Sequence, residues 1–128
     1  MAITRILIVE DEPLIRLFVV DSLEEYGFEV VEAASAADAV AKLALEAGAV
    51  GAAIIDVGLP DRPGDELAEE CRARWGDLPI VIASGRDINE FAKRFSQDNR
   101  VAVLGKPYTT DMLLDALRAV GLSPDGPG

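Results

Sequence analysis

Four short apolar segments of the sequence each end at residues that could take part in chemistry. The segments span residues 6–9, 51–55, 80–83 and 101–105, and the groups that follow them are Glu10 with Asp11, then Asp56, then Ser84, then Lys106. In an open α/β sheet, ligands bind at the carboxyl ends of the strands. If the segments are parallel strands, three carboxylates, a hydroxyl and an ammonium meet at one edge. That set suits a divalent metal ion and a phosphoryl group.

Each of these groups has an ordinary explanation when it is taken alone. The acids at positions 10–12 could cap a helix that begins at Pro13. Asp56 and Ser84 could bond to amides in turns, and Lys106 could be a solvated surface lysine. The combination is harder to explain, because carboxylates a few ångströms apart repel one another by several kcal/mol at an effective dielectric of about 20.

A magnesium ion, together with Lys106, would offset this repulsion. Magnesium is usually bound through one or two carboxylates, several waters and a phosphate oxygen. We expect Asp11 and Asp56 to bind the ion directly and Glu10 to act through water. The backbone carbonyl of Gly58 would add another ligand.

The same arrangement makes Asp56 a candidate nucleophile. A carboxylate can carry a transferred phosphoryl group as an acyl phosphate. Such a transfer depends mainly on charge neutralisation and in-line positioning. The Ser84 hydroxyl and the backbone amides of Gly58 and Gly85 could help to bind the phosphoryl oxygens. The sequence contains no histidine, so a histidine donor would have to come from a partner.

Size and charge limit the classes of function. A chain of 128 residues with 50% hydrophobic residues forms one domain with a packed core, and with 5% aromatics that core depends on aliphatic side chains. The net charge of −11 disfavours contact with nucleic acid or an anionic membrane, because phosphates would be repelled. We therefore expect basic or apolar patches of other proteins as partners.

The sequence shows no sign of secretion or of a membrane span. The single cysteine, Cys71, allows no internal disulfide, and its place on the stripe Leu67, Cys71, Trp75 predicts a small buried hydrophobe. No signal-peptide core is present, and no apolar stretch approaches the ~20 residues that cross a bilayer. A cytoplasmic location is the expectation.

Five apolar segments alternate with five helical patterns. The predicted strands span residues 5–9, 29–33, 51–55, 80–83 and 101–104, and helices are predicted from Pro13 to Gly27, from a capping box at Ser35 and Asp38 to Gly48, from 65 to 75, from Asp87 with Glu90, and from 110 to 120. Continuous apolar strands between helices predict an α/β fold with a doubly wound parallel sheet. Residues 1–122 would form the domain, and residues 123–128 a disordered tail.

The chain resembles the receiver domain of two-component response regulators. The residues that carry the resemblance are Val9-Glu10-Asp11-Glu12-Pro13, Asp56 with Leu59-Pro60 and Gly64, Ala83-Ser84-Gly85, and Lys106-Pro107. The resemblance implies a flavodoxin-like sheet in the order 2-1-3-4-5. It also implies Mg²⁺-dependent transfer from a partner's phosphohistidine to Asp56, with Glu10 and Asp11 holding the metal. In this family Ser84 would be the switch hydroxyl, Lys106 would bind phosphoryl, and the bond before Pro107 would be cis.

The chain departs from the family pattern at three positions. Val103 occupies the place of the usual aromatic, which puts the coupling between switch hydroxyl and aromatic in doubt. Tyr108 is expected to be packed or exposed near the last helix, and the loop at Ser84 faintly resembles atypical receivers that also lack the aromatic. Gly58 cannot shield an acyl phosphate and Arg86 could cover it, so we predict hydrolysis within minutes or faster. Arg86, Arg94 and Arg100 are otherwise interpreted as solvated surface charge.

Our interpretation is a stand-alone receiver that acts as a switch or phosphate relay. Its donor would be a histidine kinase or histidine phosphotransfer protein, and its target would bind the face formed by the fourth helix, fifth strand and fifth helix. It would be a monomer or a weak phosphorylation-dependent dimer. The alternatives are a receiver of a hybrid kinase, an aspartyl-phosphate phosphatase, a flavin module and a receiver that is never phosphorylated. The phosphatase would need a second acid where Gly58 stands, and the flavin module a hydroxyl-rich loop at residues 10–12.

Overall fold

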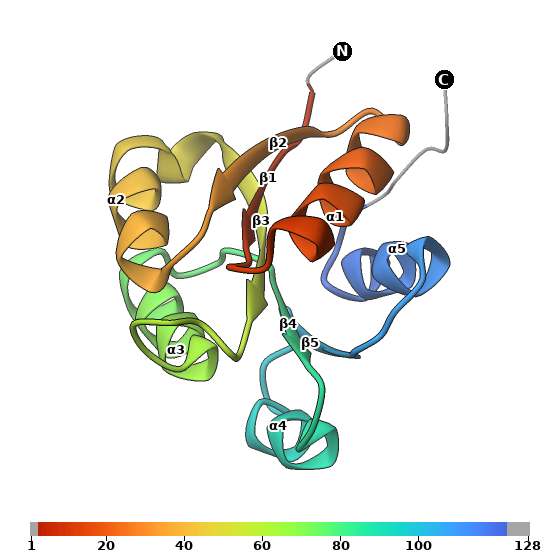
Figure 1. The fold of residues 1–128 in the computed structure, drawn as a ribbon. Helices are drawn as coiled ribbons and strands as arrows, with labels where there is room; N and C mark the ends of the chain where they lie inside the picture. Colours follow the sequence, from red (N-terminus) through yellow and green to blue (C-terminus); the bar gives the residue numbers. More distant parts are fainter. Residues whose placement is uncertain (1–2, 123–128) are drawn as a thin grey trace.

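The computed structural model describes residues 3–122 as a five-stranded parallel sheet with helices on both faces (Figure 1). The elements are, in chain order, β1 (Arg5–Val9), α1 (Pro13–Glu25), β2 (Glu29–Ala33), α2 (Ala36–Glu46), the 3₁₀ turn η1 (Ala47–Ala49), β3 (Val50–Asp56), α3 (Gly64–Arg74), β4 (Ile80–Ser84), α4 (Ile88–Arg94), β5 (Val101–Gly105) and α5 (Thr110–Ala119). The strand order β2-β1-β3-β4-β5 confirms the predicted doubly wound topology.

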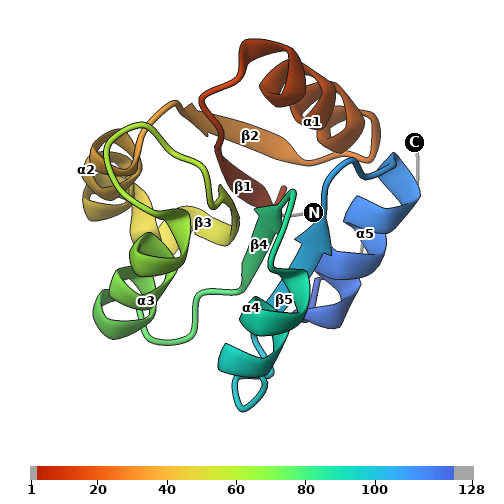
Figure 2. The same ribbon diagram turned by 60° about the horizontal axis from the view of Figure 1, so that its bottom comes forward.

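The sheet separates two hydrophobic cores, because successive strand residues point to opposite faces. On one face, α2 and α3 supply Ala36, Ala39, Leu43, Leu67, Ala68 and Cys71, which pack on Leu7, Val9, Ala53, Ile55, Ile80 and Ile82. On the other face, α1 and α5 supply Val19, Leu23, Leu113, Leu114 and Leu117. Figure 2 shows these helix pairs on either side of the strands. Because all the strand pairs are parallel, the carboxyl ends of the five strands lie at the same edge of the sheet.

Cys71 is fully buried, as its place on the apolar stripe predicts. Burial raises the pKa of its thiol to about 11. Within residues 3–122, no helix is both long enough and apolar enough to cross a membrane. The predicted tail, residues 123–128, lies outside the described residues.

The helix starts differ in part from the predicted capping. Ser35 accepts a hydrogen bond from the amide of Asp38 at 3.1 Å, as its capping position predicts. By contrast, α1 begins after Glu12, whose side chain makes no capping hydrogen bond. The capping explanation for the acids at residues 10–12 is therefore wrong for Glu12. Asp87 precedes α4 in a left-handed conformation with φ 58°, and its side chain does not cap that helix either.

Helix α4 packs on β5 and is joined to α3 by a surface ion-pair network. None of its residues is buried. Arg94 on α4 instead pairs with Asp65 and Glu69 on α3 and packs against the ring of Phe95. Arg94 is exposed, as predicted for a solvated surface charge, and its guanidinium in addition joins the two helices. Arg86 and Arg100 are exposed, as predicted.

Candidate functional site

The strand ends bring the acids and the lysine together. The Nζ atom of Lys106, just after β5, lies 2.7 Å from a carboxylate oxygen of Asp56 and 3.0 Å from one of Glu10. Carboxylate oxygens of Glu10, Asp11 and Asp56 all lie within 4.8 Å of one another. The proximity predicted from the parallel order is therefore present.

Glu10 is almost completely buried, with 1% of its surface exposed. Burial raises the pKa of its carboxyl above the ordinary value, against hydrogen bonds from Lys106 and from the amide of Glu12 that lower it. Burial would in turn lower the pKa of the Lys106 ammonium, but its bonds to Asp56 and Glu10 outweigh that effect and the pKa is raised. The lysine is therefore held protonated between two acids.

Asp56 is held by the backbone that follows it. The amide of Val57 donates to the carbonyl of Ala83 at 3.0 Å, and the amide of Gly64 donates to the carbonyl of Val57 at 2.9 Å. A Cβ on Gly64 would lie 2.0 Å from the backbone oxygen of Asp56. Only glycine permits this approach of α3 to the end of β3, which explains why the motif needs Gly64.

An open hollow of about 360 Å³ lies beside Asp56 and Lys106. It is lined by Glu12, Asp56, Val57, Gly58, Ser84, Gly85, Arg86 and Lys106. The hollow thus contains the predicted nucleophile, the lysine, the hydroxyl and both glycines whose amides were expected to bind phosphoryl oxygens. Gly58 and Arg86 are exposed at its rim.

Ser84 lines this hollow, but its hydroxyl is bonded to its own loop. The Oγ atom donates to the carbonyl of Arg86 and accepts from the amide of the same residue at 3.2 Å. These two bonds hold the loop that leads from β4 into α4.

Val103 and Tyr108 lie in different surroundings. Val103 is half-buried beside a hollow of about 410 Å³ between α4, β5 and α5, which Ile88, Ala92 and Ala119 also line. Tyr108 follows the cis bond between Lys106 and Pro107 and packs near Phe18 of α1, with ring centroids 6.2 Å apart. Burial raises the pKa of Tyr108 to about 12. Tyr108 is therefore packed against α1 and does not occupy the place of the missing aromatic.

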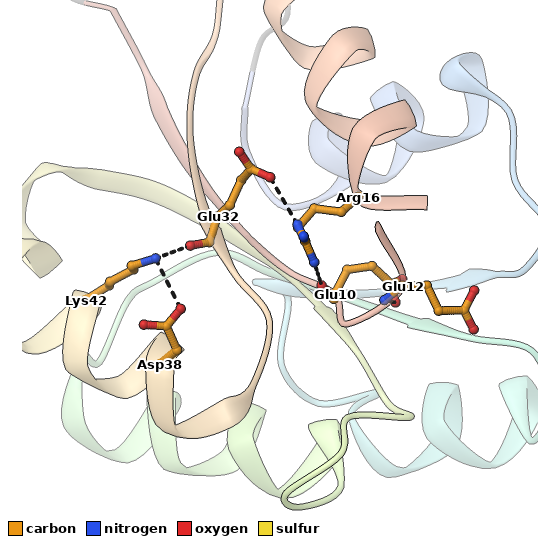
Figure 3. Close-up of polar contacts among 6 residues, drawn as sticks. All are labelled: Glu10, Glu12, Arg16, Glu32, Asp38 and Lys42. Atoms are coloured by element: carbon orange, nitrogen blue, oxygen red, sulfur yellow. Dashed lines mark hydrogen bonds and ion pairs between the residues drawn. The ribbon is translucent and has the colours of Figure 1, made fainter. Parts of the chain in front are cut away.

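Two polar residues near the site were missed by the sequence analysis. Arg16 on α1 donates to the backbone carbonyl of Glu10 at 2.7 Å and pairs with Glu32 of β2 at 3.0 Å (Figure 3). Asp61, in the loop after Asp56, accepts from the amides of Ala36 and Ala37 at 2.9 Å each. It therefore caps α2 from a distant part of the chain.

The backbone bonds from Ala36 and Ala37 lower the pKa of the Asp61 carboxyl. Asp61 and Ala36 lie 25 residues apart in the sequence and Arg16 and Glu32 lie 16 apart, whereas Arg16 and Glu10 are only 6 apart. No local pattern signals a cap that is supplied from another loop. For Arg16, the only available signal was its position one turn after the acids.

The donor atoms of the site fit a hard divalent cation. Three carboxylates converge, with a single ammonium to neutralise them, and oxygen ligands of this kind suit Mg²⁺. Asp11 is partly buried, and no ion pair involves it among residues 3–122. Its carboxylate is therefore available to a metal ion.

Comparisons with known proteins agree with this geometry. A family model described as the response regulator receiver domain matches residues 6–118. The chain is 30% identical over 113 residues to the sensor kinase CckA of Brucella abortus, which covers 88% of this chain and 12% of that protein. It is 32% identical over 113 residues to the transcriptional regulatory protein PdtaR of Mycobacterium tuberculosis, covering 88% of this chain and 54% of that protein. The chain thus spans about half or less of these two curated relatives.

Solved structures show the same likeness. The structure of a CheY-like response regulator receiver domain protein from Methanospirillum hungatei is similar, with a TM-score of 0.79 and 30% identity over 91% of this chain and 92% of that one. The receiver domain of the hybrid histidine kinase CckA is similar with a TM-score of 0.75 and 29% identity, covering 91% of this chain and 98% of that one.

Proposed function

This chain belongs to the family of response regulator receiver domains, and we propose that it accepts a phosphoryl group on Asp56 from the phosphohistidine of a histidine kinase or phosphotransfer protein. The observation that carries this proposal is the position of Lys106, between Asp56 and Glu10 at the rim of an open hollow. A buried nucleophilic carboxylate beside an ammonium and free loop amides suits phosphoryl transfer. A separate regulator and a module of a hybrid kinase would use the same site.

The transfer needs one bond to form and one to break. A carboxylate oxygen of Asp56 attacks phosphorus in line with the bond to the imidazole nitrogen of the donor. That bond breaks, and the imidazole leaves with the electron pair and takes up a proton. No general base is needed, because Asp56 attacks as the carboxylate. Lys106 and the amides of Gly58 and Gly85 would bind the phosphoryl oxygens.

We propose that Mg²⁺ is the cofactor. Glu10, Asp11, Asp56 and the carbonyl of Gly58 would hold it, with Glu10 acting through water. When bound, the ion supplies positive charge that neutralises the phosphoryl oxygens in the transition state. Glu10 already accepts from Lys106 and from the amide of Glu12, so its oxygens are less free than those of Asp11.

The phosphoryl group would act as a switch through Ser84. Its hydroxyl would leave the carbonyl of Arg86 for a phosphoryl oxygen and pull the loop that precedes α4. Because α4 has no buried residue, a small change in that loop can move it. We propose that the face formed by α4, β5 and α5 meets the target, with Val103 leaving a hollow where receivers usually have an aromatic.

A further hollow next to the site, this one apolar, offers a docking face for the protein that donates the phosphoryl group. Its volume is about 440 Å³, and it is lined by Leu14, Ile15, Phe18, Lys106, Pro107 and Tyr108. Leu14 is 81% exposed, which is unusual for so large an aliphatic side chain. A protein that brings phosphohistidine to Asp56 could bury this face beside the reacting atoms.

A phosphatase that uses an aspartyl-phosphate intermediate remains the alternative from another class. Gly58 stands where such an enzyme would need a second acid, so we expect little turnover. The test is to add excess small phosphodonor and follow released phosphate against phosphorylated protein. A receiver accumulates one phosphoryl group and releases phosphate on the scale of minutes. Many turnovers per second would support the enzyme instead.

A further inference from the structure

Arg16, a residue outside the hollow, holds the acid turn, which we define as residues 10–12. We propose that Arg16 is a positioning residue that orients the Glu10–Asp11 peptide for Mg²⁺ binding. This inference rests on the proposed function, because it concerns the same metal site. Arg16 itself touches neither the phosphoryl group nor the ion.

Arg16 bonds to the backbone of the acid turn at one point. Its Nη1 atom donates to the carbonyl oxygen of Glu10 at 2.7 Å, while its Nε donates to the carboxylate of Glu32 at 3.0 Å (Figure 3). The amide of Glu10 donates to the carbonyl of Ala33 on β2 at 3.0 Å. Both backbone polar groups of Glu10 are therefore joined to neighbouring elements.

The carbonyl of Glu10 matters because of the peptide that it belongs to. That carbonyl and the amide of Asp11 lie in one plane, so a bond to the carbonyl limits the rotation of the whole unit. Glu10 has further side-chain bonds to Lys106 and to the amide of Glu12. Asp11 has no ion pair within residues 3–122, so its carboxylate is oriented mainly through its backbone.

Glu32 gives Arg16 a fixed anchor even though its own side chain is exposed. It lies on β2, and Lys42 of α2 donates to its backbone carbonyl. Lys42 also pairs with Asp38 at 3.1 Å. Figure 3 shows this chain of contacts from the acid turn through Arg16 and Glu32 to the start of α2. The guanidinium therefore joins the acid turn to β2, whose backbone is in turn bonded to Lys42 of α2.

A purely electrostatic role and a positioning role of Arg16 predict opposite changes in Mg²⁺ affinity when Arg16 is replaced. A cation near a cation site repels Mg²⁺, so loss of the charge alone would tighten metal binding. Loss of orientation would weaken it, and partners of metal ligands typically contribute about 10–100-fold in metal affinity. The direction of the change therefore separates the two roles.

The experiment measures the Mg²⁺ dissociation constant by calorimetry for wild type, Arg16→Met, Arg16→Lys and Glu32→Gln. Arg118→Met is the matched control, because it removes one surface arginine whose only ion pair within residues 3–122 is with Asp115. Thermal unfolding in chelator checks that each variant is folded without metal. We expect about tenfold weaker binding for Arg16→Met, smaller losses for Arg16→Lys and Glu32→Gln, and a value near wild type for Arg118→Met.

A second readout follows phosphoryl adduct formation against Mg²⁺ concentration. For Arg16→Met, we expect the half-maximal Mg²⁺ concentration to rise about tenfold while the saturating rate stays within about threefold of wild type. Equal or tighter Mg²⁺ binding by a folded Arg16→Met protein would overturn the positioning role alone. If wild type forms no adduct and binds no Mg²⁺, the proposed function fails together with this inference.

Discussion

Lys106 and Asp56 lie 2.7 Å apart across the end of a strand that belongs to neither of them. Asp56 ends β3 and Lys106 follows β5, while β4 lies between these two strands in the sheet. The lysine therefore reaches across the carboxyl end of β4 to pair with the acid. Its positive charge holds Glu10 and Asp56 together.

Replacement of Lys106 should lower stability and slow phosphoryl transfer but strengthen metal binding. In Lys106→Met, Glu10 loses its buried ion pair, so the metal-free protein should lose roughly 1–3 kcal/mol of unfolding free energy. Mg²⁺ should bind more tightly, because the lysine no longer competes for the same oxygens. Adduct formation should slow on the order of a hundredfold, as expected when one charge-stabilising donor is removed. Weaker Mg²⁺ binding in this variant would contradict the prediction that Lys106 competes with Mg²⁺ for the carboxylate oxygens.

Gly64 should tolerate no side chain. In Gly64→Ala the new Cβ would meet the backbone oxygen of Asp56 at 2.0 Å, so the end of β3 must shift. We expect a loss of roughly 1–3 kcal/mol in unfolding free energy and slower phosphorylation. Gly48→Ala is the control, because a Cβ added at Gly48 would have no neighbouring atom within 4 Å. Chemical denaturation should find that control close to wild type or slightly more stable.

The cap from Asp61 to α2 should make stability depend on pH. Its carboxyl has a folded-state pKa below the ordinary 3.8, so the stabilisation is present above that value and is lost as pH falls through the folded pKa. Wild type should therefore melt at a higher temperature than Asp61→Asn at pH 7, and this advantage should shrink below pH 4. A difference in melting temperature that stays constant from pH 7 to pH 3 would contradict the prediction.

The apolar face at α1 should matter only to protein donors. Leu14→Lys places a charge in this face, and we expect transfer from a phosphorylated histidine protein to slow about tenfold, the effect of losing one interface anchor. Phosphorylation by a small phosphodonor should not change. Leu45→Lys is the control, because Leu45 is 86% exposed on α2, away from this face. Equal slowing with both kinds of donor would place the defect at Asp56 instead.

The sequence predicted the fold and the strand-end residues because both depend on local patterns. Apolar runs that end in Glu10, Asp56, Ser84 and Lys106 imply one sheet edge once the strands are parallel. Gly64, one of the residues that carry the family resemblance, likewise marks the start of α3. The bonds of Arg16 to β2, of Asp61 to α2 and of Arg94 to α3 could not be predicted, because each joins segments that are distant in sequence. Their partners become visible only when the helices are placed on the sheet.

The most direct test of the phosphoacceptor is the intact mass of the protein after incubation with a small phosphodonor and Mg²⁺. We expect one phosphoryl adduct on wild type, no adduct on Asp56→Asn, and none on wild type when Mg²⁺ is removed by chelation. An adduct that persists in Asp56→Asn would show that Asp56 is not the phosphoacceptor, and one that forms equally without Mg²⁺ would show that the transfer does not depend on the metal.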